Sequence, residues 1–150
     1  MTGRTTTESL RSEPFGAPTR KKEVVMDTSV FYRGVLFALR ERHRTTFIAE
    51  GTKFHAAFRA MLETAVHEPP FAAAAERMLE NFDPVFGVFP EATEMLLEGE
   101  RDFIVALENP RLRIAQFKLD EEEARNELNE LPSADEFRKL AAHLDERLGT

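Results

Sequence analysis

The sequence predicts a mainly helical protein with one β-hairpin, which places it in the α+β class. Apolar residues recur at helical spacing through most of the chain after residue 22, and this spacing fails only in residues 101–119. There, residues 103–107 (FIVAL) form a short apolar run with two β-branched members, and residues 108–110 (ENP) are typical of a turn. Residues 112–119 then return as a second strand, so we expect the hairpin near residues 102–119.

An all-α helical bundle is the alternative interpretation of the same stretch. Residues 92–107 then continue one helical stripe, Asn109 is an N-cap, and Pro110 is the first residue of another helix. We favour the hairpin because residues 120–123 (DEEE) are typical of a helix start, with an acidic cap and an acidic first turn. A helix that begins at residue 120 implies that a different element ends at residue 119.

The chain divides into two parts. Residues 1–22 are rich in Thr, Ser, Pro and Gly, lack periodicity and carry five Arg and Lys residues against two Glu residues, so we expect a disordered basic arm. Residues 23–150 are predicted to form a single helical domain that contains the hairpin, because a chain of 150 residues can bury a substantial core.

Six helices are expected in this domain, and capping and breaking residues set their ends. Thr52 is expected to cap the second helix, and Glu-Pro-Pro at residues 68–70 ends it. Lys53, His55 and Arg59 fall on the polar side of that helix. The expected ranges are 28–44, 52–68, 71–82, 90–98, 120–131 and 133–148.

Composition indicates a soluble, cytoplasmic protein. Apolar residues make up 42% and charged residues 31% of the chain, and no apolar run approaches the roughly 20 residues of a membrane span, so we expect no membrane association. The chain contains no cysteine, which excludes disulfides and thiolate chemistry. No Glu precedes a histidine at the spacing of a di-iron site, and no phosphate loop or dinucleotide motif is present, so we expect no metal and no cofactor.

Charge is distributed unevenly along the chain. Residues 1–59 hold 11 Lys and Arg against 6 Asp and Glu, whereas residues 60–150 hold 9 against 21. The basic first third could bind a phosphate backbone, or the two parts could complement each other within one fold or between two copies. If nucleic acid is bound, the candidate binding residues are Arg20, Lys21, Lys22, Arg33, Arg40, Arg42, Arg44, Lys53 and Arg59.

The segment at residues 23–31 (EVVMDTSVF) resembles the opening of a PIN-domain nuclease. The resemblance implies that Asp27 helps to hold a divalent metal ion. Such a fold also needs further strands with acids at their ends, and the sequence that follows is helical. In the alternative interpretation, Thr28 or Ser29 caps a helix that runs to about Arg44.

Arg138 and His143 in the last helix resemble the Arg-x(4 to 6)-His motif of HEPN ribonucleases. The resemblance implies an RNA-cleaving site at a dimer interface formed by these two residues. The residue after Arg138 is Lys139, where the family usually has a small polar residue.

The expected order of elements resembles a winged-helix domain with C-terminal dimerisation helices. Residues 71–82 and 91–98 would then form the helix-turn-helix, and Arg111 and Arg113 would lie on the wing. The corresponding recognition helix carries Glu91, Glu94 and Glu98, whose carboxylates would repel phosphates. Such a fold would therefore be used for protein contacts, or would meet DNA through the basic residues between 33 and 59.

These observations favour a non-enzymatic regulatory or protein-interaction module that binds a protein partner or forms a homo-oligomer through its C-terminal helices. No catalytic residue is assigned in this interpretation. The alternatives are a winged-helix-like transcriptional regulator that binds nucleic acid and a small PIN-like or HEPN-like ribonuclease.

Overall fold

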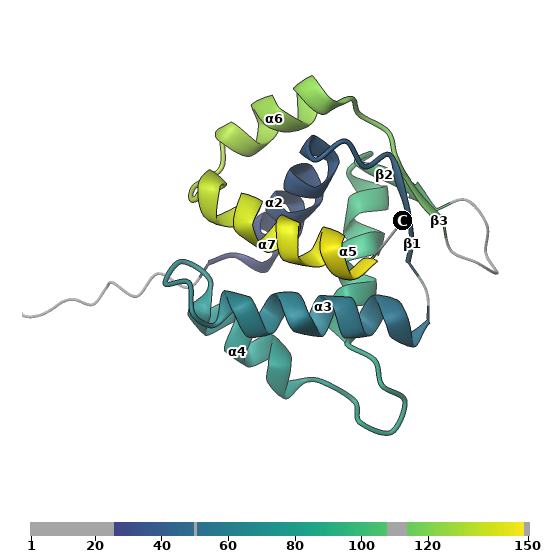
Figure 1. Ribbon diagram of the computed structural model, residues 1–150, viewed down its shortest axis with the longest axis vertical. Helices are drawn as coiled ribbons and strands as arrows, with labels where there is room; N and C mark the ends of the chain where they lie inside the picture. Colours follow the sequence, from purple (N-terminus) through teal and green to yellow (C-terminus); the bar gives the residue numbers. More distant parts are fainter. Residues whose placement is uncertain (1–25, 50, 108–113, 149–150) are drawn as a thin grey trace, which may run out of the picture.

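The computed structural model describes residues 26–49, 51–107 and 114–148, which form six helices and three strands (Figure 1). The mainly helical α+β prediction is confirmed, and the all-α alternative is wrong. The predicted arm at residues 1–22 lies outside the described residues. In chain order the elements are α2 (Thr28–Glu41), β1 (Thr46–Ile48), α3 (Thr52–Ala65), α4 (Ala72–Glu80), α5 (Pro90–Arg101), β2 (Val105–Leu107), β3 (Ile114–Phe117), α6 (Glu121–Asn129) and α7 (Ala134–Leu148).

The predicted hairpin is formed by β2 and β3, which pair antiparallel with Val105 opposite Phe117. The intervening residues 108–113, including Arg111 and Arg113, lie outside the described residues. In β3, Ala115 and Phe117 are buried while Gln116 is exposed. Burial therefore alternates from residue to residue, as expected for a strand with one face against the core. Asp120 caps α6 through a capping box with Glu123, which confirms the helix start that argued for the hairpin.

A third strand, β1, was not predicted. It pairs antiparallel with β3, with Phe47 opposite Ala115, so the strand order in the sheet is β1-β3-β2. Phe47 is buried, whereas Thr46 and Ile48 on either side of it are exposed. Three residues are too few to give a periodic signal, which explains why this segment was expected to be a connection.

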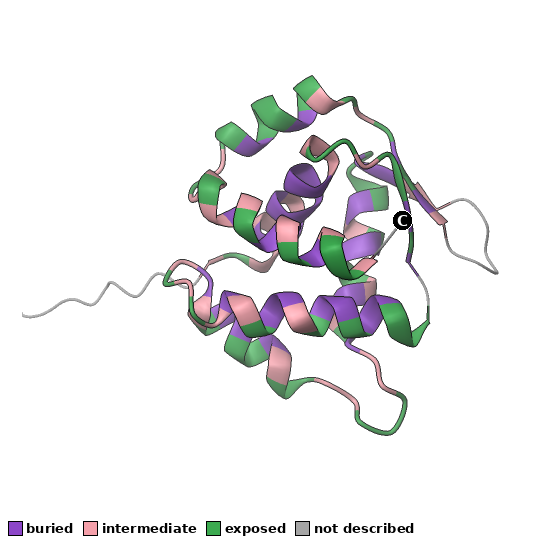
Figure 2. Cartoon of the chain, viewed as in Figure 1, coloured by how far each residue is buried: buried purple, intermediate pink, exposed green. Residues whose placement is uncertain are grey.

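α2 is the central helix of the fold. Asp27 caps it by accepting a hydrogen bond from the Ser29 backbone N–H at 2.8 Å, rather than Thr28 or Ser29 serving as the cap. Every residue from Gly34 to Leu39 is buried, so the helix has apolar contacts nearly all round. α5, α6 and α7 pack against it, and α7 also packs against α3 (Figure 1). Figure 2 shows that α6, by contrast, exposes most of its outer surface.

Close packing of α2 against α7 depends on a glycine. A Cβ atom at Gly34 would lie 2.3 Å from the Phe137 ring, so no larger residue fits without movement. Phe137 also contacts Phe31 and Phe71, with ring centroids 6.2 and 4.8 Å away and tilted planes. Most described phenylalanines are core residues of this kind, and the exceptions with high exposure are Phe86 and Phe103.

His55 is buried, so its prediction on the polar side of α3 is wrong. Only 9% of the residue is exposed, and its Nδ1 accepts a hydrogen bond from the Phe89 backbone N–H at 3.0 Å. Burial lowers the pKa of His55, because the charged imidazolium is poorly solvated there. Lys53 and Arg59 on the same helix are exposed, as predicted.

Candidate functional site

The nine basic residues proposed for nucleic-acid binding do not share one environment. Arg20, Lys21 and Lys22 lie outside the described residues. The other six come from α2, the turn that follows it, and α3. Their positions show which cations are already engaged within the fold.

The arginines at the end of α2 bond to the C-terminal part of the chain. Arg40 Nε donates to the Leu119 carbonyl at 2.9 Å. Arg42 Nε donates to the Asp145 carboxylate at 3.3 Å, and Arg44 Nε donates to the other oxygen of the same carboxylate. The Asp145 carboxylate partly neutralises Arg42 and Arg44, whereas Arg40 meets an uncharged carbonyl. They favour the interpretation in which basic and acidic parts of the chain complement each other within one fold.

The remaining three basic candidates differ in their contacts. Arg33 donates to the Ser29 hydroxyl at 3.1 Å. Arg59 pairs with Glu63 at 3.3 Å and lies 4.8 Å from the centre of the Phe82 ring, a cation–π contact. Lys53 has no ion pair or side-chain hydrogen bond with any described residue. Of the six, Lys53 therefore keeps the most accessible charge.

Asp27, the residue singled out by the PIN resemblance, has a structural role as the N-cap of α2. All strand pairs of the described sheet are antiparallel, and no group of three His, Asp or Glu side chains in residues 26–49, 51–107 and 114–148 is placed to hold a metal ion. The described part of the chain therefore offers Asp27 no partner acids for metal chemistry.

Arg138 and His143, which suggested a HEPN motif, point to different sides of α7. Five residues of a helix correspond to a rotation of about 140°. Arg138 binds both oxygens of the Glu41 carboxylate, at 2.8 and 3.0 Å, and also donates to Asp135 and Asn129. His143 is exposed. The two residues do not form a joint site within this chain, and the ribonuclease hypothesis stays a prediction.

Three of the four acidic residues of α5 accept hydrogen bonds from other parts of the fold, whereas Glu100 is exposed. Glu94 accepts a hydrogen bond from the Tyr32 hydroxyl at 2.8 Å, Glu98 accepts one from the Ser29 hydroxyl, and Glu91 accepts one from an Asn81 side-chain N–H. Burial and the nearby carboxylates raise the pKa of Tyr32, which therefore remains a hydrogen-bond donor. These acids attach α5 to α2 and to the residue that follows α4.

A groove of about 510 Å³, lined by both apolar and charged side chains, lies between α2, α6 and the turn that joins α5 to β2. Phe37 and Ile104 are buried in its floor, and Leu119 and Leu131 line it with partly buried side chains. Phe103 also lines the groove, although 76% of that residue is exposed. We call this feature the Phe103 groove.

The backbone at Phe103 adopts an unusual conformation. Its φ is 62°, in the left-handed region that bulky residues avoid. Phe103 ends α5 in a Schellman motif, in which its N–H donates to the Glu100 carbonyl at 3.2 Å and the Ile104 N–H donates to the Gly99 carbonyl at 2.8 Å. Glycine is the usual residue at this position. The sequence pattern did not predict this helix end, because Phe103 belongs to the apolar run that predicts the first hairpin strand.

The rim of the Phe103 groove is acidic. Asp102, Glu127 and Glu130 line it, against the single cation Arg33. All three acids are exposed, and none of their carboxylates has an ion pair with another described residue. Unlike Glu41 or Asp145, they remain available to charged groups from outside the chain.

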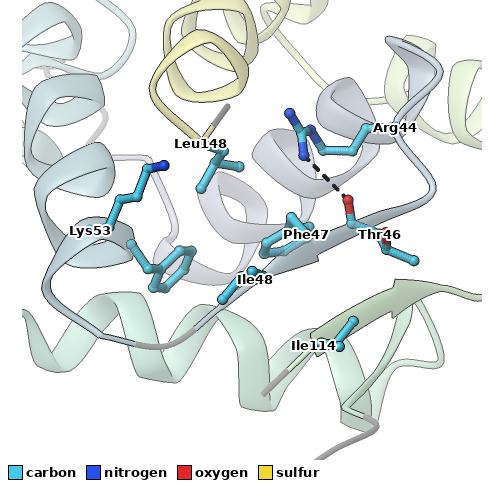
Figure 3. A pocket seen from close by; sticks show the side chains of 8 residues that line it. Arg44, Thr46, Phe47, Ile48, Lys53, Ile114 and Leu148 are labelled. Atoms are coloured by element: carbon cyan, nitrogen blue, oxygen red, sulfur yellow. Dashed lines mark hydrogen bonds between the residues drawn. The ribbon is translucent and has the colours of Figure 1, made fainter. Parts of the chain in front are cut away.

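A second hollow of about 320 Å³ lies between β1, α3 and the end of α7 (Figure 3). Two of the predicted basic residues, Arg44 and Lys53, line it together with apolar side chains. The sequence analysis proposed both residues for phosphate binding, but it did not place them at one concave site.

Comparisons with models of protein families, with curated proteins and with solved structures gave no match. Every helix in the described parts of the chain is too short to cross a bilayer, since the longest, α7, has 15 residues where about 20 are needed. The chemistry of the site is thus the basis for a functional proposal.

Proposed function

We propose that this protein is a protein-interaction module that binds a basic, amphipathic segment of a partner protein in the Phe103 groove. The partner segment would place apolar side chains on the groove floor and Lys or Arg side chains against Asp102, Glu127 and Glu130. Helices with one apolar face and basic flanks have this chemistry, and binding of such a helix in a groove is a common mode of recognition.

The conformation and exposure of Phe103 are the main observation behind this proposal. A left-handed backbone at a non-glycine residue costs about 1 to 2 kcal/mol. Because 76% of Phe103 is exposed, burial of its ring stabilises the fold too little to offset this cost. Glycine at this position would give a more stable fold. A large, exposed apolar side chain beside a groove that is lined in part by apolar residues is instead suited to contact with a partner, since aromatic residues contribute much of the binding energy at interfaces.

Charge at the rim selects the class of partner. The three carboxylates and one guanidinium of the rim give the groove a net negative charge, which matches the net charge of −7 of the whole chain. A phosphate backbone would be repelled here, whereas a basic peptide would be attracted. This surface therefore supports the protein-interaction hypothesis rather than the nucleic-acid alternative.

The proposal can be tested with a fluorescein-labelled helical peptide of about 18 residues that contains only Leu and Lys at amphipathic spacing. Its affinity for the full chain would be measured by fluorescence anisotropy at about 150 mM salt, where long-range attraction is screened. A peptide with Glu in place of Lys is the control for the ligand. We expect the Lys peptide to bind and the Glu peptide not to bind.

A matched pair of protein variants separates groove binding from general attraction. Glu127→Lys with Glu130→Lys reverses charge at the rim, and Glu76→Lys with Glu80→Lys makes the same change in net charge on exposed positions of α4. We expect the rim variant to bind the Lys peptide at least about tenfold more weakly and the α4 variant to bind with nearly wild-type affinity. An equal loss in both variants would refute the proposal.

A further inference from the structure

The hollow shown in Figure 3 differs from the Phe103 groove in both position and charge. Its walls come from β1, the first turn of α3, Ile114 of β3 and Leu148 near the end of α7. The volume of about 320 Å³ falls within the range of roughly 300 to 1,000 Å³ that is typical of small-molecule sites.

The floor of the hollow is aromatic. The rings of Phe47 and Phe54 are nearly parallel, with centroids 6.1 Å apart and planes inclined by 22°. Both residues are almost fully buried, at 4% and 1% exposure, so their positions are held by the core. Ile48 lines the hollow with 59% of its surface exposed. A ligand with an apolar body would cover this surface and remove it from water.

The charged residues of the hollow are cations. Figure 3 shows Lys53 extending from α3 toward the hollow, with the guanidinium of Arg44 on its other side. Arg44 is bonded to Asp145, but the Lys53 ammonium has no ion pair or hydrogen bond with any described residue. Lys53 also lies in the first turn of α3, which contains no acidic residue and has Gly51 as a cap without a side-chain hydrogen bond. The positive end of the helix dipole thus adds to the charge of Lys53.

From this geometry we infer that the hollow binds a small monocarboxylate with an apolar body, such as an aryl-alkyl acid. Its carboxylate accepts a charge-assisted hydrogen bond from Lys53, and its apolar body lies on the floor formed by Phe47 and Phe54. The site is independent of the Phe103 groove, because the two share no lining residue. Failure of one proposal therefore leaves the other unaffected.

The test uses 4-phenylbutyrate as the probe and 4-phenyl-1-butanol as its uncharged counterpart. Both would be titrated into the full chain labelled with ¹³C at Ile and Leu methyl groups. We expect the acid to shift the methyl resonances of Ile48, Ile114 and Leu148, and the alcohol to bind about tenfold more weakly, as the loss of one charge-assisted hydrogen bond implies.

Two variants locate the charged contact. Lys53→Gln removes the accessible ammonium at an exposed position. Lys139→Gln removes an exposed lysine of α7 that does not line the hollow and whose Nζ lies 3.8 Å from Glu68 Oε1. We expect Lys53→Gln to lower the affinity for the acid about tenfold, to the level of the alcohol, and Lys139→Gln to change nothing. Equal affinity for acid and alcohol, unchanged binding in Lys53→Gln, or shifts confined to residues outside the hollow would each overturn the inference.

Discussion

The guanidinium of Arg138 in α7 and the carboxylate of Glu41 in α2 form two parallel hydrogen bonds, from Nε to Oε1 at 2.8 Å and from an amino nitrogen to Oε2 at 3.0 Å. The Glu41 side chain is only 13% exposed, and Arg125 approaches the same carboxylate at 3.3 Å. This pair joins the central helix to the last helix. It uses the arginine that the sequence suggested for RNA cleavage.

Replacing Arg138 should destabilise the fold. Arg138→Met leaves a mostly buried carboxylate with Arg125 as its remaining cationic partner, so we expect a loss of about 1 to 3 kcal/mol in the free energy of unfolding. Urea denaturation at pH 7 would measure it. Arg125→Met, which removes the more exposed partner, is the control and should cost less. A loss below about 0.5 kcal/mol for Arg138→Met would contradict the role assigned to the pair.

The same pair should make stability depend on pH in the acid range. Hydrogen bonds from Arg138 lower the pKa of Glu41 below its ordinary value of 4.5. The folded state therefore favours the ionised carboxylate, and this contribution is present above pH 4.5 and lost as the pH falls through the lowered pKa. We expect the stability difference between wild type and Arg138→Met to shrink between pH 7 and pH 3. A constant difference over that range would show that packing alone causes it.

His55 predicts a second pH effect nearer neutrality. Because burial lowers its pKa from 6.5, the unfolded chain binds the proton more readily than the folded chain. The contribution of neutral His55 to the free energy of unfolding is fully present above pH 6.5. It is lost as the pH falls from 6.5 toward the lowered pKa of the folded state, by at most about 1.4 kcal/mol per pH unit. His55→Gln keeps a hydrogen-bond acceptor without titrating, so its unfolding free energy should change less between pH 7 and pH 5. Identical pH profiles would refute this assignment.

Gly34 should not tolerate even one added methyl group. Alanine favours a helix over glycine by about 1 kcal/mol, but its Cβ would meet three atoms of the buried Phe137 ring at 2.3 to 2.5 Å. We expect Gly34→Ala to destabilise by about 1 to 3 kcal/mol. Gly99→Ala is the comparison variant. Its added Cβ would lie 2.8 Å from a terminal methyl carbon of Leu36, so the steric overlap is smaller and we expect a smaller loss of stability. The prediction fails if Gly34→Ala is as stable as wild type in thermal unfolding.

Much of the fold could be predicted from local patterns, whereas the contacts between distant segments could not. The turn-forming residue types at 108–110 and the acidic residues at 120–123 indicated the hairpin, and the burial of residues of α3 such as Phe58 and Met61 agrees with their helical spacing. β1 exists because it pairs with β3, which is far away in the sequence. His55 was placed on the polar face because periodicity treats histidine as polar, and its acceptor contact with the Phe89 N–H comes from another element.

The candidate sites were harder to predict, because they too depend on contacts between residues that are far apart in the sequence. Counting basic residues identified Arg42 and Arg44, but it could not show that both bond to Asp145, about a hundred positions later. Arg44 and Lys53 line the second hollow because β1 and α3 bring them together. Phe103 lies in an apolar run that predicts a strand, and its left-handed backbone has no sequence signal without glycine or asparagine.

Phe103→Gly should stabilise the protein. Glycine adopts the left-handed conformation without the steric cost that phenylalanine carries, and little buried surface is lost at this position. We expect the free energy of unfolding to rise by about 1 kcal/mol in urea denaturation. A matched change at another exposed phenylalanine, Phe86→Gly, should give no such gain, because the residue with a positive φ in that loop is Gly87 and not Phe86. Destabilisation by Phe103→Gly would show that this residue serves the fold.

The affinity of the Leu and Lys peptide for wild type and for Phe103→Gly is the most direct test of the proposed interaction module. The account predicts that the variant is at least as stable as wild type and binds the peptide about tenfold or more weakly, as expected for the loss of an aromatic anchor. Unchanged affinity in a folded Phe103→Gly protein would contradict the proposal that the Phe103 groove is the site of partner binding.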